Sequence, residues 1–431
     1  MERTFHSSGL EDPGNRARLD RLRGLYPTRV KHLLLFASTT GYQIRVFAEA
    51  ARRIGAEVTL ATDRCHILDD PWGDRAIAVK FDQIPESLAA LRKAILRVDG
   101  VTAVGDKPAI LAAEAAAMYG VPFHPPGAAR MGHDKHAARE RYRAAGMLVP
   151  EFFRAASEAD AVRAPFPCVL KPIGQSASKG VIRANDPTEF AAAFRRISQM
   201  GEPKVQVEAY IPGREFALEG LVTRGRLQTI AIFDKPDPLE GPYFEETIYV
   251  TPSRESAEVQ QTLIDTAQQA VTALGLSHGP VHVELRYNDC GAWILETHAR
   301  PIGGLCSRSL RMADAVPFEE MIMVHAFGGD VTMAKLDGPA SGVMMIPTPM
   351  NGLYRGVEGI EQALAVRLIE EVTITASDGQ HFVPPPEGSS YLGFIFARGQ
   401  TPEKVEAALR VSHGELKFHF APALPTLSPS S

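Results

Sequence analysis

The sequence predicts an α/β protein, with an α+β arrangement toward its C-terminus, on three observations. The chain has 431 residues, of which 45% are hydrophobic, enough for two to four subdomains with a substantial core. Short apolar runs alternate with amphipathic stretches over residues 30–119, which favours a doubly wound parallel sheet. Residues 279–306 then alternate apolar and polar side chains on both sides of a turn, which is typical of a β-hairpin.

The composition excludes several classes of protein. The net charge is −5 and no block of like charge stands out, so neither a nucleic-acid groove nor a polybasic membrane surface is expected. The polar N-terminus, with charges of both signs, does not resemble a signal peptide. Four scattered cysteines argue against a zinc site or a disulfide framework and fit a reducing compartment: Cys65, Cys168, Cys290 and Cys306. We expect a cytoplasmic protein that acts on small molecules.

The first region follows a polar arm at residues 1–27. Strands are expected at 30–37, 56–61 and 101–104, and helices from the first strand's turn to Arg53, at 85–98 and at 107–119. This order predicts a Rossmann-like domain over residues 28–125. A nicotinamide-binding unit, and with it a dehydrogenase, is the alternative. Its first turn needs a glycine-rich fingerprint, which Ser38-Thr39-Thr40-Gly41 does not provide.

Two lysines stand out in the next region. Lys135 lies four residues before Arg139, so both share one helix face, and spacing alone favours a solvated face. Lys171 ends a predicted strand and precedes a loop of small residues, 173–181. Backbone N–H groups of such a loop can cover phosphates, although its spacing is not that of a Walker loop. A mobile hairpin tip is the alternative, against which Lys171 counts as a point charge suited to phosphate.

A strand at 205–210 and a hairpin from Glu215 to Phe233 follow, joined by a connector that is expected to link a small lid to a larger body. The proline-rich loop 234–246 is the candidate substrate loop, because loops on a rigid scaffold often carry specificity. Its acidic end is otherwise solvated surface. A helix is expected at 255–274 and another at 317–327. Strands at 342–347, 370–376 and 391–398, a helix at 402–411 and a disordered tail complete the chain.

The hairpin at 279–306 carries the most chemistry. If it is symmetric about Cys290, Glu284 lies opposite Glu296 and His282 opposite His298. Opposed carboxylates repel each other unless a cation such as Mg²⁺ lies between them. A solvated polar face in a different register is the alternative. Arg300, which is followed by Gly303 and Gly304, favours an anion site.

In this order and spacing the pieces resemble the ATP-grasp superfamily from about residue 30 onward. The segments FDKPDPLEGPYFEETIYVTPS, SGVMMIPTP and YLGFIFARG are similar to regions of the L-amino-acid (dipeptide) ligases. The resemblance implies an ATP-grasp fold: a Rossmann-like pre-ATP-grasp domain at 28–125, an ATP-grasp domain at 126–335 with its lid at about 150–212, and a C-terminal α+β domain at 336–431.

The resemblance also implies site residues. Lys135 and Lys171 would contact phosphates, and Arg300 would act in the transition state. Metal binding, by Mg²⁺ or Mn²⁺, falls to Glu284 and Glu296. The remaining ATP-binding residues are those of the glycine-rich loop, the adenine hinge and the ribose-binding acid: Ser176, Ser178, Gly180, Glu208, Ala209, Ile211 and Glu215.

The residues also suggest a site for an amino-acid-like substrate. Glu246 is expected to accept an ammonium, Gly303 and Gly304 to orient a carboxylate, and His282 to lie beside the metal carboxylates. His298 stands where the family usually has asparagine. Because imidazole is a poor ligand for hard Mg²⁺, we expect His298 to face phosphates or substrate instead.

These implications predict an ATP-dependent carboxylate–amine ligase that works through an acyl phosphate and releases ADP and phosphate. No residue is identified as the base for the amine. A carboxylase that uses bicarbonate is one alternative, although no motif for a biotin acceptor is evident. A non-catalytic nucleotide-binding module is another, although it would be expected to lose Arg300 or a metal carboxylate. The assembly state is open, with a homodimer as one candidate.

Overall fold

The computed structural model describes residues 29–38, 43–63, 76–95, 97–201, 204–312, 316–332, 336 and 338–423. The predicted polar arm and the tail lie outside these residues. Among the described helices, none has the length and apolar character needed to cross a membrane.

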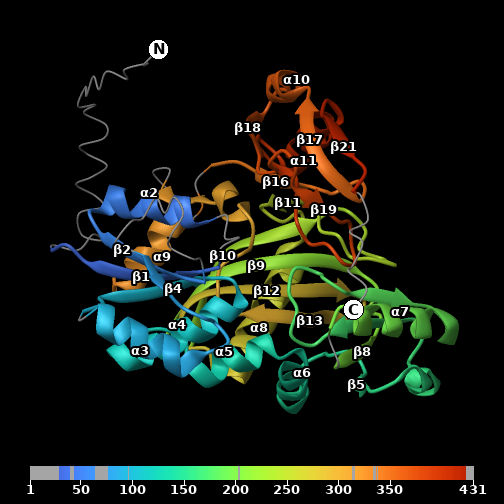
Figure 1. Cartoon of the computed structure of the whole chain (residues 1–431), viewed down its shortest axis with the longest axis horizontal. Coiled ribbons are helices and arrows are strands. Elements are labelled where there is room, and N and C mark those ends of the chain that lie inside the picture. Colours follow the sequence, from blue (N-terminus) through green and yellow to red (C-terminus); the bar gives the residue numbers. More distant parts are fainter. Residues whose placement is uncertain are drawn as a thin grey trace, which may run out of the picture.

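The N-terminal region is a four-stranded parallel sheet covered on both faces, as predicted. Its order is β3 (Ala76–Ala78), β2 (Glu57–Thr62), β1 (His32–Ala37), β4 (Gly100–Val104). Figure 1 shows α2 (Ile44–Ile54) and α9 (Phe318–Ala326) on one face, and α3 (Ile84–Ala94) and α4 (Asp106–Tyr119) on the other. Leu33 and Leu35 of β1 pack toward the first pair of helices, and Leu34 and Phe36 toward the second. A strand buried on both faces is apolar at every position, which explains the run LLLFA.

Two helices lead from this region into a small lid subdomain. They are α5 (Pro126–His133) and α6 (Lys135–Ala144), and Asp134 caps α6 by accepting from the N–H groups of His136 and Ala137. The lid sheet has the order β5 (Phe152–Ala155), β8 (Val205–Ala209), β6 (Cys168–Pro172), β7 (Ile182–Ala184). Helix α7 (Pro187–Gln199) packs on this sheet and gives the lid a core of its own.

An eight-stranded sheet with antiparallel neighbours forms the centre of the molecule (Figure 1). Its order is β13 (Gly291–His298), β12 (His278–Asn288), β9 (Arg214–Thr223), β10 (Arg226–Lys235), β11 (Ile248–Thr251), β16 (Ser341–Ile346), β20 (Gly393–Arg398), β18 (Ile369–Ile374). Three strands from the C-terminal region, β16, β20 and β18, therefore extend this central sheet.

The remaining elements complete the C-terminal region and the covering of the sheet. Helix α8 (Ala257–Leu274) packs against β13 and β10. The others are β14 (Arg311–Met312), β15 (Val316–Pro317), β17 (Gly352–Glu358), β19 (His381–Phe382), β21 (Lys417–Ala421), α10 (Ile360–Ala365), α11 (Pro402–Gly414), and the short 3-10 turns η2 (Glu158–Arg163) and η3 (Cys306–Ser309).

The β12–β13 hairpin has the predicted pairing of residues, but a β-bulge and not symmetry about Cys290 produces it. Glu284 pairs with Glu296, and His282 with His298. The turn, however, is Asp289–Cys290, so plain two-residue symmetry would place Glu284 opposite Leu295. A β-bulge after Glu284 leaves Leu295 without a counterpart and restores the carboxylate pair.

Candidate ATP-grasp active site

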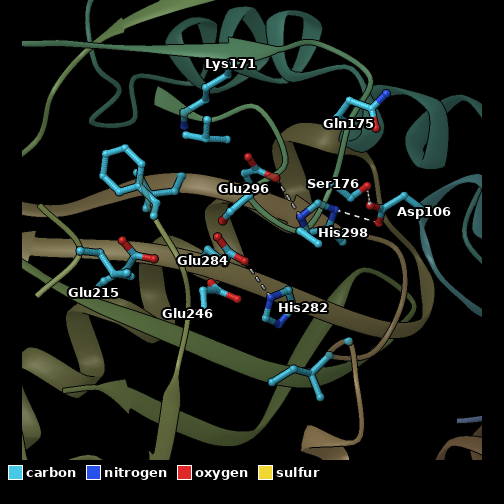
Figure 2. Close-up of a pocket in the computed structure, with 18 of the residues that line it drawn as sticks. Asp106, Lys171, Gln175, Ser176, Glu215, Glu246, His282, Glu284, Glu296 and His298 are labelled. Atoms are coloured by element: carbon cyan, nitrogen blue, oxygen red, sulfur yellow. Dashed lines mark hydrogen bonds and ion pairs between the residues drawn. The ribbon is translucent and has the colours of Figure 1, made fainter. Parts of the chain in front are cut away.

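One cavity of about 350 Å³ lies between the β12–β13 face, the lid loop and the start of α4. Figure 2 shows carboxylates and histidines converging on it from several elements. It is lined by every residue that the sequence predicts for the site except Gly180: Lys135, Lys171, Ser176, Ser178, Glu208, Ala209, Ile211, Glu215, Glu246, His282, Glu284, Glu296, His298, Arg300, Gly303 and Gly304. The predicted substrate loop also contributes Leu239 and Phe244 to the wall.

Each predicted metal carboxylate lies beside a histidine of its own strand. His282 Nε2 is 3.1 Å from Glu284 Oε1, and His298 Nε2 is 3.1 Å from Glu296 Oε2. The two imidazole rings stack with centroids 5.8 Å apart (Figure 2). The predicted register therefore produces a compact group of two carboxylates and two imidazoles.

The two histidines differ in charge because their outer partners differ. Burial lowers the pKa of His282 in spite of its hydrogen bond with Glu219, so its ring is neutral. Burial also disfavours charge on His298, but Asp106 and Glu296 outweigh it and raise the pKa of His298 to about 9. His298 is thus an imidazolium between two carboxylates. A protonated nitrogen cannot bind a metal, and the expectation that His298 is not a metal ligand stays a prediction.

Asp106, at the start of α4, is a site residue that the sequence did not reveal. Its carboxylate is 3.0 Å from His298 Nδ1 and accepts hydrogen bonds from Arg300 Nε at 2.8 Å and Ser176 Oγ at 2.5 Å (Figure 2). Burial would raise its pKa, but Arg300 and His298 hold the pKa of Asp106 well below the ordinary value. One buried anion therefore connects the N-terminal sheet, the lid loop and the predicted catalytic arginine.

The two lysines that the sequence predicts to contact phosphates are held by acceptor groups of the protein. Lys171 Nζ is 2.9 Å from Glu208 Oε2, and Arg139 donates to both oxygens of the same carboxylate at 2.8 and 3.1 Å. Despite burial, these cations lower the pKa of Glu208 to about 2. Lys135 Nζ donates to the Gln175 carbonyl at 2.7 Å. Lys135 and Arg139 are only 8% and 2% exposed, so the solvated face that spacing alone favoured is wrong.

The predicted adenine hinge already uses part of its backbone. The Ala209 N–H donates to the Glu151 carbonyl at 2.8 Å, and the Ile211 carbonyl accepts from Arg286 Nη1 at 2.6 Å. The Ala209 N–H and the Ile211 carbonyl are therefore already occupied. The side chain of Glu208 is directed at Lys171 and Arg139.

A second missed residue, Lys235, lies among three predicted site acids. Its Nζ is 2.9 Å from Glu215 and 3.9 Å from Glu284, and it donates to Glu246. Carboxylate oxygens of these three acids lie within 4.8 Å of one another, a spacing that also suits a metal ion. Lys235 neutralises part of this charge, and despite burial the acids raise the pKa of Lys235 well above its ordinary value.

The lid loop adopts an unusual backbone. Ala177 and Ser178 both have positive φ, 55° and 54°, which side chains with a Cβ rarely adopt. Gly180 follows with φ of 72°, and its N–H donates to the Pro386 carbonyl at 2.7 Å. This contact explains why Gly180 lies outside the cavity lining: its amide meets the C-terminal region.

The missed residues had weak sequence signals. Asp106 follows a predicted strand and opens a helix, which is a position where site residues often lie. Lys235 ends a strand at the start of the predicted substrate loop. No local sequence pattern links either residue to its partner. Asp106 lies 194 residues before Arg300, and Lys235 lies 20 residues after Glu215.

Comparison with family models matches two segments of the chain. Residues 164–309 match the ATP-grasp domain, and residues 344–421 match the L-amino acid ligase C-terminal domain 2. The chain carries an ATP-grasp domain. That domain includes Lys171, Glu208, the hairpin acids and Arg300, while the second match contains β18, β20 and the second half of β16, the strands that extend the central sheet.

Of two relatives, one aligns with most of the chain and the other with about half of it. An ATP-grasp enzyme, fsqD of Aspergillus fumigatus, is 24% identical, covering 87% of this chain and 76% of its own length. A D-alanine–D-alanine ligase of Pseudomonas putida is 26% identical over 47% of this chain and 67% of its own length.

Solved structures share the ATP-grasp fold. An L-amino acid ligase of Bacillus licheniformis has a TM-score of 0.78 at 23% identity, covering 92% of this chain and all of that one. A biotin carboxylase of Campylobacter jejuni, in a β-γ-ATP complex, has a TM-score of 0.64 at 16% identity, covering 91% and 93%. The predicted ATP-grasp fold is therefore confirmed, and the chain is similar to L-amino acid ligases in its overall fold and in its C-terminal domain.

Proposed function

We propose that this protein is an ATP-dependent carboxylate–amine ligase that joins amino-acid-like substrates through an acyl phosphate. The observation that carries the proposal is the convergence of phosphate-type cations, a paired carboxylate face and a clamped arginine on one cavity. The match to an L-amino acid ligase C-terminal domain supports an amine as the acceptor.

One observation supports the binding of a divalent cation by the hairpin carboxylates. A neutral His282 bonded to Glu219 carries its proton on Nδ1, so the Nε2 lone pair faces Glu284 Oε1 at 3.1 Å. Two acceptors that face each other repel, and a cation beside Glu284 Oε1 offsets this repulsion. Glu284 and Glu296 would hold Mg²⁺, and Mn²⁺ by the same oxygen chemistry. When bound, such an ion neutralises charge that develops on the phosphoryl oxygens.

The residues of the chain then have distinct tasks. Lys171 and Lys135 are fixed by Glu208 and the Gln175 carbonyl, so they present charge to phosphates without losing much side-chain freedom on binding. The substrate carboxylate attacks the γ-phosphate of ATP, giving an acyl phosphate and ADP. An amine then attacks the acyl carbon, the bond to the phosphate oxygen breaks, and phosphate leaves.

Arg300 is the residue we assign to the charge on the activated carboxyl group. Its Nε is held by Asp106 at 2.8 Å, and its Nη1 donates to the Pro301 carbonyl at 3.0 Å. Both bonds fix the plane of the guanidinium before substrate arrives, which is the preorganisation that electrostatic catalysis requires. Gly303 and Gly304 line the same end of the cavity.

The substrate ammonium has Glu246 as its proposed acceptor. Glu246 already pairs with Lys235, and burial raises the pKa of Glu246. The neighbouring acids Glu215 and Glu284 give this corner three carboxylates for two cations, Lys235 and Arg286. An added ammonium therefore meets net negative charge.

The test is to measure ADP, phosphate and amide together over a panel of amino-acid pairs. All three should appear in equal amounts. Arg300→Ala should lose this activity while its ATP affinity changes far less, and a folded Glu296→Ala protein should make no ADP. If ATP turnover follows bicarbonate and ignores every amine, the protein is a carboxylase. ATP binding without any turnover would indicate a non-catalytic module.

A further inference from the structure

A short segment of the C-terminal region, residues 384–388, lies against the lid subdomain; we name it the clasp. Its Pro386 carbonyl accepts the Gly180 N–H of the lid loop at 2.7 Å. Glu387 forms a two-pronged ion pair with Arg196 of α7, in which Nη2 and Oε2 are 2.8 Å apart. These contacts join residues about 200 positions apart.

The predicted substrate loop meets the lid at the same edge. Arg196 Nη1 donates to the Tyr243 hydroxyl at 2.6 Å. Arg183 of β7 donates from its N–H to the Pro242 carbonyl at 2.9 Å and from Nη1 to the Glu240 carbonyl at 2.8 Å. Arg196 thus holds both the clasp and the substrate loop from one helix of the lid.

The clasp also leads directly into the cavity. Tyr391, three residues after the clasp, lines the cavity. Burial, followed by Glu246, raises the pKa of the Tyr391 hydroxyl well above its ordinary value. The stretch from residue 384 to Tyr391 therefore contacts the lid loop near its N-terminal end and lines the cavity at its C-terminal end.

The Arg196–Glu387 pair is too exposed to matter greatly for the fold. The side chains are 41% and 37% exposed, and such ion pairs contribute little to global stability. The lid has its own hydrophobic core, so it can move as a unit against the rest of the molecule. A weak pair across such a boundary changes the closed-to-open ratio of the lid while leaving each part folded.

We propose that Glu387 and Arg196 are positioning residues that hold the lid closed while the acyl phosphate exists. This rests on the proposed ligase function. In an open lid, water attacks the acyl carbon in place of the amine, the bond to the phosphate oxygen breaks, and the products are the original carboxylate, phosphate and a proton. The clasp thereby determines how much ATP is converted into amide.

The experiment compares Glu387→Gln and Arg196→Gln with the wild type in the full-length protein. Phosphate release and amide formation are measured in the same reactions with an active amino-acid pair. Glu370→Gln is the matched control, because Glu370 is also a C-terminal carboxylate paired with an arginine, Arg311 at 2.8 Å, and is 33% exposed, but it lies away from the lid. Thermal unfolding confirms that each variant is folded.

We expect the excess of phosphate over amide to rise by about two- to fivefold in both clasp variants, as the loss of one partly exposed ion pair allows, and to stay unchanged in Glu370→Gln. A non-hydrolysable ATP analogue should also protect residues 174–180 from proteolysis less in the clasp variants than in the wild type. In the double variant Arg196→Glu with Glu387→Arg, the amounts of phosphate and amide should return toward those of the wild type.

Two results would overturn the idea in different ways. If the wild type forms amide but the excess of phosphate over amide is the same in every variant, the clasp does not control closure. If the wild type forms no amide from any pair, the proposed function itself fails, whatever the clasp does.

Discussion

Strand β12 carries a histidine of a stacked pair at two places, and the two pairs differ in the chemistry of their partners. His278, at its start, stacks on His325 with ring centroids 3.9 Å apart, and His124 lies close by. These rings bond to backbone carbonyls and to Thr223. Four residues along the strand, His282 stacks on His298 among carboxylates.

The protonation of these histidines follows their partners. Burial lowers the pKa of His325 to about 3 and that of His124 to about 4, because no carboxylate among the described residues lies beside them and the Pro280 carbonyl offsets only part of the effect on His124. The pKa of His298 is raised to about 9, since two carboxylates outweigh the same burial. One strand thus joins a neutral structural cluster to a charged site, and partner chemistry decides which is which.

The largest expected effect is acid destabilisation from the structural cluster. His124 and His325 have pKa values below the ordinary 6.5, so their contribution is present above pH 6.5 and is lost as the pH falls. Between pH 6.5 and about 4.5 the free energy of unfolding should drop by roughly 5 kcal/mol if the two act independently. Denaturant unfolding across this range measures it. His325→Gln should flatten the slope, and an unchanged slope would contradict the assignment.

The contribution of His298 to stability should show the opposite dependence on pH. Because the pKa of His298 is raised to about 9, its contribution is complete below pH 6.5 and disappears as the pH rises through 9. The loss should reach about 3 kcal/mol, measured with a chelator and without nucleotide. His298→Asn should remove this alkaline slope. His419→Asn, which breaks an exposed pair with Glu358, is the control and should leave it in place.

Asp106→Asn should separate catalysis from folding at the charged site. The amide keeps a hydrogen-bond acceptor for Arg300 but loses the charge that compensates Arg300 and His298. We expect kcat to fall by about 10–100-fold, with a smaller change in the KM for ATP. Asp99→Asn, on the same domain but bonded to Arg29 and His32, should keep full activity. Equal losses in both variants would mean that Asp106 is only structural.

The smallest effect concerns the neutral cluster alone. Thr223→Val removes the 2.8 Å hydrogen bond between its hydroxyl and His325 Nε2. Unfolding should become easier by about 1–2 kcal/mol, while ligase activity at the other end of the strand should not change. Matched unfolding and activity assays check both parts, and a loss of activity would show that the two clusters are coupled.

Much of the fold was predictable because its signals are local. The strands and helices of the N-terminal sheet appear as apolar runs and amphipathic periods, and the structure has them in parallel order. The short strands β3, β17, β19 and β21 were not predicted. The hairpin pairing was predicted through a symmetry that the structure does not have, and the bulge at Leu295 supplied the missing residue.

The sequence by itself determined which side chains share a strand face and which loops carry small residues, because those follow from backbone periodicity. Only the tertiary structure decided the partners of the charged groups. Asp106 holds Arg300, Glu208 pairs with Arg139 and Lys171, and Lys235 lies among three acids. The same partners make His298 charged, whereas His282 is neutral. The physical reason is that charge in a protein interior depends on burial and on partners a few ångströms away. Those partners come from distant segments, whose meeting no local pattern records.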